Sequence, residues 1–326
     1  MNLFEARQPA DCRFTEILYE KKGPVARVTI NRPGHYNAYN TQALKELIAA
    51  FTDAAWDDAI AVVVYTGAGD KAFSTGGDVK EYQAYYTKRP RDYYKYMGLF
   101  RAYLESLLNL GKPSIARING MAVGGGNESQ MACDLAVMAD DTFVGQIGTN
   151  VGSVACGGGT QWLPIMVGDR RAREMLLLNQ RIPAAQALAW GLVNRVVPRA
   201  QLDDAVDELV QQLLDKFTEC TRYTRTQVNF WKELAWHQTI GHARDWLTTH
   251  FACGEPNEGM RAFVQKRKVD YRGLRRKMAE GGSVEFLWGS YSVTCPSCGA
   301  DALPSEFVFC GQCGHALTAP ESQARQ

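Results

Sequence analysis

The sequence predicts an α/β protein with a helical C-terminal region and a small metal-binding appendage. Short apolar runs alternate with stretches of helical apolar spacing up to about residue 200. Helical patterns dominate from there to residue 279, and two Cys-x-x-Cys pairs follow. We therefore expect a main domain at 1–279, with a core at about 14–200 and a helical part at 201–279. A linker at 280–294, the appendage at 295–316 and a tail at 317–326 complete the predicted division.

The alternating region begins with a predicted strand at Val25–Ile30, where apolar residues recur at every second position. Apolar residues between positions 44 and 51 then fall at helical spacing, and either Asn40 or Thr41 is suited to cap that helix. Pro90 should interrupt a long helical stretch at 82–108. Further strands are predicted at 61–65, 114–118 and 134–139, and further helices at 128–132, 171–178, 184–190, 202–217 and around 228–247. This order favours right-handed crossovers with helices packed around a core of sheet.

The overall composition is that of an ordinary globular protein with a sizeable core, at 46% hydrophobic and 22% charged residues. A net charge of +1 offers no basis for binding nucleic acid. The sequence contains neither an apolar run of membrane-spanning length nor a basic and apolar leader at its N-terminus. We therefore expect a cytoplasmic protein with no membrane partner.

The nine cysteines fall into two groups. Five are scattered along the chain, at Cys12, Cys133, Cys156, Cys220 and Cys253, and are expected to be reduced structural thiols. The other four, Cys295, Cys298, Cys310 and Cys313, form two Cys-x-x-Cys pairs whose spacing favours a tetrahedral zinc site. A pair of redox dithiols or unliganded thiols would be the alternatives, and His315 is a weaker substitute ligand. Four thiolates leave no open coordination position, so we expect the zinc to be structural. The segment resembles a zinc ribbon, for which binding of a protein partner is one possible role.

Two glycine-rich segments, Lys71–Asp78 and Asn119–Glu128, carry the strongest chemical signal. Each follows a predicted buried strand and leads into a predicted helix. Glycine lets backbone N–H groups face a ligand closely, and N–H groups at the start of a helix suit an oxyanion. With a carboxylate at Glu128, these segments predict an enzyme that polarises a carbonyl and moves a proton beside it.

Both segments resemble the paired signatures of the crotonase (enoyl-CoA hydratase/isomerase) superfamily, over roughly residues 14–272. Further similar segments are Asn31–Pro33 with Asn37 and Ala38, Gly157–Gln161, Ala184–Val193 and Glu258–Phe263. The resemblance implies a repeated ββα superhelix whose C-terminal helices pack against a neighbouring subunit, in a homotrimer or a dimer of trimers. It also implies an acyl-CoA thioester as substrate and no redox cofactor.

The resemblance assigns roles to individual residues. The backbone N–H groups of Gly77 and Gly125 would hold the thioester oxygen, although glycines can also serve only a tight turn. Glu128 would act as general acid and base, although it could instead complement the helix dipole. Asp78 is interpreted as a helix cap. For CoA, Ala72 and Lys80 lie where the family contacts it, while Phe263 and Lys266 would reach adenine and phosphate from a neighbouring subunit.

The sequence also departs from the better-known branches of the superfamily. Gly148 stands where hydratases carry a second glutamate. Ala155 and Gly158 stand where dihydroxynaphthoyl-CoA synthases and similar enzymes carry an aspartate and a tyrosine. Both absences fit the ring-opening 6-oxocyclohex-1-ene-1-carbonyl-CoA hydrolases. Several segments of this chain also resemble those enzymes: Gly76–Tyr86, Tyr93–Phe100, Gly152–Gly168, Phe217–Cys220 and Ala243–Leu247. This chain lacks an insertion of that branch after Val197, so a related cyclic acyl-CoA is a further possibility.

The predicted activity is therefore addition of water to a cyclic conjugated oxo-acyl-CoA with hydrolytic ring opening, in aromatic or alicyclic degradation. Tyr82, Tyr85 and Tyr86 could line a pocket for the ring, although tyrosines at helical spacing more often simply pack. One alternative is an enoyl-CoA hydratase or isomerase that uses Glu128 alone. Another is a non-catalytic scaffold, against which the joint presence of Gly77, Gly125 and Glu128 argues.

Overall fold

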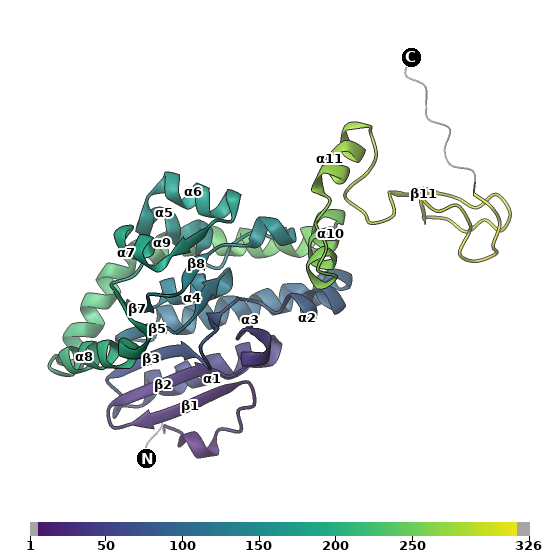
Figure 1. Cartoon of the computed structure of the whole chain (residues 1–326). Coiled ribbons are helices and arrows are strands. Elements are labelled where there is room, and N and C mark those ends of the chain that lie inside the picture. Colours follow the sequence, from purple (N-terminus) through teal and green to yellow (C-terminus); the bar gives the residue numbers. More distant parts are fainter. Residues whose placement is uncertain (1–5, 318–326) are drawn as a thin grey trace.

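The computed structural model describes residues 6–317 and contains two main sheets with helices packed around them (Figure 1). The larger sheet has six strands in the order β1-β2-β3-β5-β7-β10, antiparallel between β1 and β2 and parallel elsewhere. Their bounds are β1 Ile17–Lys22, β2 Val25–Ile30, β3 Val62–Gly67, β5 Ser114–Ile118, β7 Leu135–Ala139 and β10 Arg195–Val197. The smaller sheet, in the order β4-β6-β8-β9, consists of β4 Ala72–Ser74, β6 Met121–Val123, β8 Phe143–Gly145 and β9 Arg181–Pro183.

Eleven α-helices surround these sheets in the described part of the chain. Those of the alternating region are α1 Thr41–Trp56, α2 Val79–Ala84, α3 Pro90–Leu108, α4 Gly125–Ala132, α5 Gly159–Val167, α6 Asp169–Leu178 and α7 Ala184–Ala189. The C-terminal region holds α8 Leu202–Leu214, α9 Thr218–His250, α10 Gly254–Val264 and α11 Tyr271–Ala279. None of the helices in residues 6–317 has the length and apolar character needed to cross a membrane.

The ββα repeat that the family resemblance implied is present as three consecutive units. A strand of the larger sheet leads to a short strand of the smaller sheet and then to a helix, in β3-β4-α2, β5-β6-α4 and β7-β8-α5. This is the predicted ββα superhelix with a helical C-terminal region. Since β4, β6 and β8 pair in parallel, the loops that follow them emerge at the same edge of the smaller sheet.

The centre of the larger sheet is buried on both faces. Along β3, Val63 and Tyr65 pack into the main core with α1 and α3, whereas Val62 and Val64 face the second cluster, which α8 covers through Leu202, Val206 and Leu209. Every residue of β3 is therefore buried, as expected for a central parallel strand. The apolar runs predicted as buried strands correspond to β3, β5 and β7.

Helix starts follow from local chemistry. Asn40, rather than Thr41, caps α1, because its side-chain oxygen accepts a hydrogen bond from the Ala43 N–H at 2.8 Å. The stretch at 82–108 is interrupted as predicted: α2 ends at Ala84, and α3 begins with Pro90 in its first turn. The helix predicted around 228–247 is longer than expected, since α9 runs continuously from Thr218 to His250.

A small hairpin follows α11 and lies away from the two sheets (Figure 1). It pairs β11 Tyr291–Val293 with β12 Leu303–Pro304, so it begins inside the segment 280–294 that we assigned to a linker. The domain boundaries themselves stay a prediction. The predicted tail at 317–326 lies outside the described residues, except for Leu317.

Candidate active site

The two glycine-rich loops lie against each other. The first joins β4 to α2 and the second joins β6 to α4, and β4 and β6 are neighbours in the smaller sheet. A Cβ atom added to Gly76 would lie only 2.6 Å from the backbone nitrogen of Gly125. Segments about fifty positions apart in the sequence therefore place Gly77 and Gly125 at one site.

Both positions also require glycine for steric reasons. A Cβ at Gly77 would lie 1.7 Å from the Tyr82 hydroxyl, and one at Gly125 would lie 1.7 Å from the Tyr39 hydroxyl. Within residues 6–317, neither glycine donates its N–H to a hydrogen bond. Both glycines line the same cavity. Two unpaired N–H groups in the lining of one cavity are suited to stabilise an oxyanion.

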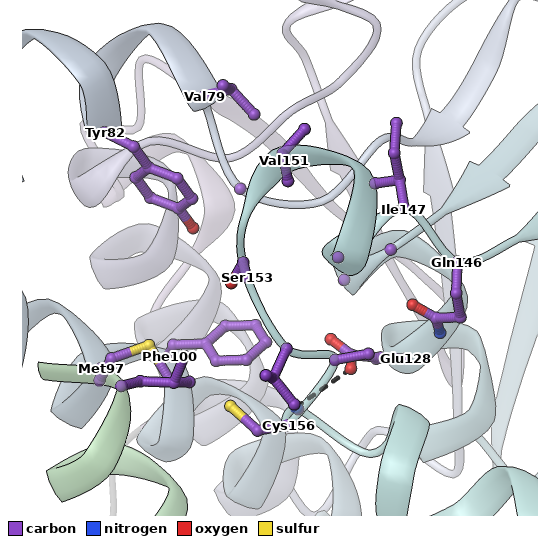
Figure 2. A pocket seen from close by; sticks show the side chains of 18 of the residues that line it. Val79, Tyr82, Met97, Phe100, Glu128, Gln146, Ile147, Val151, Ser153 and Cys156 are labelled. Atoms are coloured by element: carbon purple, nitrogen blue, oxygen red, sulfur yellow. Dashed lines mark hydrogen bonds between the residues drawn. The ribbon is translucent and has the colours of Figure 1, made fainter. Parts of the chain in front are cut away.

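Glu128 occupies the first turn of α4 and is 3% exposed. Its Oε1 atom accepts hydrogen bonds from the N–H groups of Gly157 and Gly159, both at 3.0 Å. Figure 2 shows the Glu128 carboxyl group in the cavity, with the first of these bonds dashed. Burial raises the pKa of Glu128 to about 7, although these two hydrogen bonds oppose the rise. A carboxyl group with a pKa near 7 can both accept and return a proton at neutral pH.

The inner cavity, which we define by Gly77, Gly125 and Glu128, has a volume of about 90 Å³. Among the described residues that line it, Glu128 is the only carboxylate. Gly148 lines it too, and a Cβ there would meet the Ser153 carbonyl oxygen at 3.0 Å, so this position has little room for a glutamate. Ala155 adds no acid, and Gly158 does not line the cavity. The cavity also contains the Cys156 thiol, whose pKa is raised by burial and by nearby Glu128, so the thiol is not a ready nucleophile.

Of the three tyrosines predicted for the pocket, the structure brings only Tyr82 to the cavity, with its hydroxyl 2.7 Å from that of Tyr96. Tyr85 is exposed and donates a hydrogen bond to Asp92, and Tyr86 is buried with its hydroxyl 2.5 Å from Thr41 Oγ1. The three tyrosines would share one face of a continuous helix. However, α2 ends at Ala84 and a 3-10 turn follows, so Tyr85 and Tyr86 do not line the cavity with Tyr82.

A larger groove of about 670 Å³ adjoins the inner cavity and shares Gly77 and Gln146 with it. It is lined by three of the residues predicted to bind CoA: Lys80, Phe263 and Lys266. Phe263 and Lys266 were expected to come from a neighbouring subunit. They line the groove of their own chain, because α10 packs against α2, and a contribution from a neighbouring subunit stays a prediction.

Ala72 is the fourth predicted CoA contact, and the structure does not bring it to the groove. It is buried in β4, and its carbonyl oxygen accepts a hydrogen bond from the Asn37 side chain at 2.7 Å. Sequence reasoning in turn missed Arg181, which lines the groove from β9 and stacks on Phe143. A basic residue in a strand too short to predict carries no recognisable signal.

Asp78 acts as a cap, as predicted. Its carboxylate accepts from the N–H groups of Lys80 and Glu81 at the start of α2 and pairs with Arg32. It therefore contributes to holding the loop that carries Gly77.

Gln146 is the functional candidate that sequence reasoning missed. It follows β8, is 2% exposed and lines both the inner cavity and the groove. Neither its Oε1 nor its Nε2 atom has a hydrogen-bond partner in the described part of the chain. No sequence pattern predicts an unpaired amide, because pairing depends on which distant segments surround it.

The four clustered cysteines converge at the hairpin. All four sulfur atoms lie within 4.8 Å of one another, and His315 is not part of this group. Gly299 and Gly314 follow the two cysteine pairs with φ values of 73° and 74°, a left-handed conformation that glycine adopts readily. No disulfide joins any of the nine cysteines, all of which lie within the described residues. The donor set and its geometry are compatible with a zinc ribbon.

Comparison with known proteins agrees with this geometry. The family model for enoyl-CoA hydratase/isomerase matches residues 20–275. The chain belongs to this family. It is 32% identical to a 6-oxocyclohex-1-ene-1-carbonyl-CoA hydrolase from Geobacter metallireducens, over 78% of this chain and 81% of that protein. It is 31% identical to the protein of the same name from Thauera aromatica, over 81% of this chain and 88% of that one.

Among solved structures, an enoyl-CoA hydratase from Mycobacterium avium subsp. paratuberculosis is similar with a TM-score of 0.72 and 26% identity. The match covers 79% of this chain and 98% of that chain. The shared fold and family identify this chain as an enzyme of the acyl-CoA hydratase and hydrolase class within the crotonase superfamily.

Proposed function

We propose that this enzyme adds water to a cyclic conjugated oxo-acyl-CoA, of the 6-oxocyclohex-1-ene-1-carbonyl-CoA kind, and opens its ring by hydrolysis. The observation that carries the proposal is a single buried carboxyl group, with a pKa of about 7, in one cavity with two unpaired glycine N–H groups. The names of the two relatives supply the substrate class. The reaction would belong to the breakdown of aromatic or alicyclic compounds.

In the first step, Glu128 in its ionised form removes a proton from water, and the oxygen attacks the β-carbon of the conjugated thioester. The C=C electron pair moves to the thioester oxygen, where the N–H groups of Gly77 and Gly125 stabilise the negative charge. The proton held by Glu128 then goes to the α-carbon, and the net change is addition of one water. Removing one oxyanion donor typically lowers turnover about a hundred- to a thousand-fold.

In the second step, water adds to the ring ketone and the bond between that carbon and the α-carbon breaks. Its electron pair again moves to the thioester oxygen, so the same two N–H groups serve both steps. The ketone carbon becomes a carboxylate at the far end of the opened chain, and protonation of the α-carbon completes an open-chain hydroxy-acyl-CoA. One carboxyl group suffices because each step needs a proton first removed from water and then returned to carbon.

The groove binds the CoA part of the substrate in this proposal. Its charged lining is mainly basic, with Lys80, Arg181 and Lys266 outnumbering Asp78, and Phe263 offers an aromatic face for adenine. Its continuity with the inner cavity at Gly77 and Gln146 allows the acyl group to enter the cavity while the nucleotide stays in the groove.

We also propose that Cys295, Cys298, Cys310 and Cys313 hold one zinc ion. Four thiolates close the coordination sphere, so the ion would stabilise the hairpin and take no part in the reaction. In the described part of the hairpin, two of these cysteines, Cys295 and Cys310, are the buried core together with Leu317, and only a few partly buried apolar side chains pack against them. So small a core needs a further source of stability, which a metal supplies.

The activity is tested by mass spectrometry of products formed from 6-oxocyclohex-1-ene-1-carbonyl-CoA and, separately, from crotonyl-CoA. Gain of two waters on the cyclic substrate, abolished by Glu128→Gln, is the expected result. Hydration of crotonyl-CoA alone would refute ring opening and leave a plain hydratase that uses Glu128. Binding of both thioesters without turnover would favour the non-catalytic scaffold.

A further inference from the structure

Gln146 stands out among the buried polar side chains near the site. Of the residues that line both the inner cavity and the groove, it alone carries a side-chain amide. The loop position is held firmly, because Gly145, the preceding residue, accepts a hydrogen bond from the Gly124 N–H at 3.0 Å. Gln146 is thereby anchored beside the loop that presents Gly125.

The amide also lies close to the catalytic carboxyl group. A Cβ atom added to Gly159 would lie 2.9 Å from Glu128 Oε1 and 3.1 Å from Gln146 Nε2, so these two polar atoms are neighbours, although Gly159 itself does not line the cavity. Figure 2 shows the Gln146 amide directed toward the side of the cavity that holds Glu128. A polar atom bound in the cavity beside Glu128 is therefore within reach of Gln146.

An amide buried without partners destabilises the folded protein, whereas an apolar side chain of the same length would fill the space without that penalty. Within residues 6–317, both polar atoms of Gln146 are buried and unpaired, and the residue lines the inner cavity. A purely structural glutamine would be paired with the protein. The missing partner is thus expected to be a bound ligand.

We propose that Gln146 is the residue that selects an acyl group bearing an oxygen away from its thioester. This inference rests on the proposed function. Nε2 donates a hydrogen bond to that oxygen, the ring ketone of the proposed substrate, and Oε1 accepts one from the hydroxyl or water beside it. A plain enoyl chain would leave the amide unpaired and would bind less well, since a site built for a hydrogen bond discriminates against ligands that lack the group.

The test compares two ligands that differ only in the ketone: 6-oxocyclohex-1-ene-1-carbonyl-CoA and cyclohex-1-ene-1-carbonyl-CoA. Dissociation constants are measured by calorimetry in a Glu128→Gln background, which prevents turnover. Gln146→Met removes both polar atoms at nearly constant length, and Met97→Leu, in the same cavity, controls for small changes in packing. Thermal melting shows that each variant is folded, and Gln146→Met should melt no lower than its parent.

The parent should prefer the oxo ligand, and Gln146→Met should reduce this preference by about tenfold to about a hundredfold, through weaker binding of the oxo ligand alone. Met97→Leu should keep the preference. If Gln146→Met keeps it too, the role of Gln146 is wrong while the proposed function stands. If the parent shows no preference, this inference is wrong whatever the products are. If the preference depends on Gln146 but no ring opening occurs, the inference stands and the proposed function fails.

Discussion

Replacing Glu128 with glutamine should raise the stability of the protein at alkaline pH while abolishing its activity. Burial raises the pKa of this carboxyl group from 4.5 to about 7 in the folded state. Since the folded protein holds the proton more tightly, its stability falls as pH rises through this interval and stays low above pH 7. At about 1.4 kcal/mol per pKa unit, the ionised carboxylate destabilises the fold by about 3 kcal/mol.

Glutamine is neutral at every pH, and its carbonyl oxygen can still accept from the N–H groups of Gly157 and Gly159. Relative to wild type, Glu128→Gln should therefore be more stable by about 3 kcal/mol at pH 8, with the difference vanishing below about pH 4.5. Urea unfolding at fixed protein concentration measures this, with fluorescence of the buried residues Trp162 and Trp236 reporting on the main domain.

Glu46 offers a matched control of opposite sign. Burial alone would raise its pKa, but hydrogen bonds from the Gln42 side chain and the backbone N–H groups of Thr15 and Glu16 outweigh burial and lower it. Glu46→Gln should thus be less stable than wild type at neutral pH, with the difference disappearing as pH falls. A Glu128→Gln difference that is independent of pH, or that destabilises at pH 8, would refute the reasoning. The confirmed pattern would mean that stability is sacrificed at this site for a proton-transfer group.

Four further predictions follow from the same geometry. Because water activation needs ionised Glu128, kcat/KM should rise about tenfold per pH unit below pH 7 and level off above it. Initial-rate measurements across this range test the prediction, and a pH-independent kcat/KM would exclude Glu128 as the base. Lys266→Ala should raise KM for acyl-CoA about tenfold with kcat unchanged, whereas exposed Lys268→Ala, outside the groove, should alter neither steady-state constant. Elemental analysis should find about one zinc per chain, reduced in Cys298→Ser and retained in Cys220→Ser; equal zinc in both variants would contradict the assigned ligands. Light scattering should show a homotrimer or a dimer of trimers. Trp231→Glu should dissociate it, because Trp231 on α9 is 63% exposed in the single chain and is suited to a subunit interface. A monomeric wild type would count against this assembly.

Much of the fold and part of the site could be predicted from local sequence alone. The strands at Val25–Ile30 and Ser114–Ile118 have the predicted bounds, because a buried or half-buried strand of five or six residues leaves a readable apolar pattern. The spacing of four cysteines predicted their convergence, since two tight turns place all four thiols together. The two glycine-rich segments and Glu128 were also recognisable, because an oxyanion site between strand and helix needs glycine and a nearby carboxylate, whereas the choice of Gly77 and Gly125 within those segments came from the resemblance to the crotonase superfamily.

Other features were decided only by tertiary structure. Strands β4, β6, β8 and β9 have three residues each, too few for a period, and yet their pairing brings the two glycine loops together. The pKa of Glu128 is raised by burial among distant segments, and hydrogen bonds from a loop about thirty positions away oppose this rise. The lack of partners for Gln146 depends on every segment that surrounds it. A sequence encodes local conformation and chemistry, whereas burial, proximity and pairing between distant segments exist only once the chain has folded.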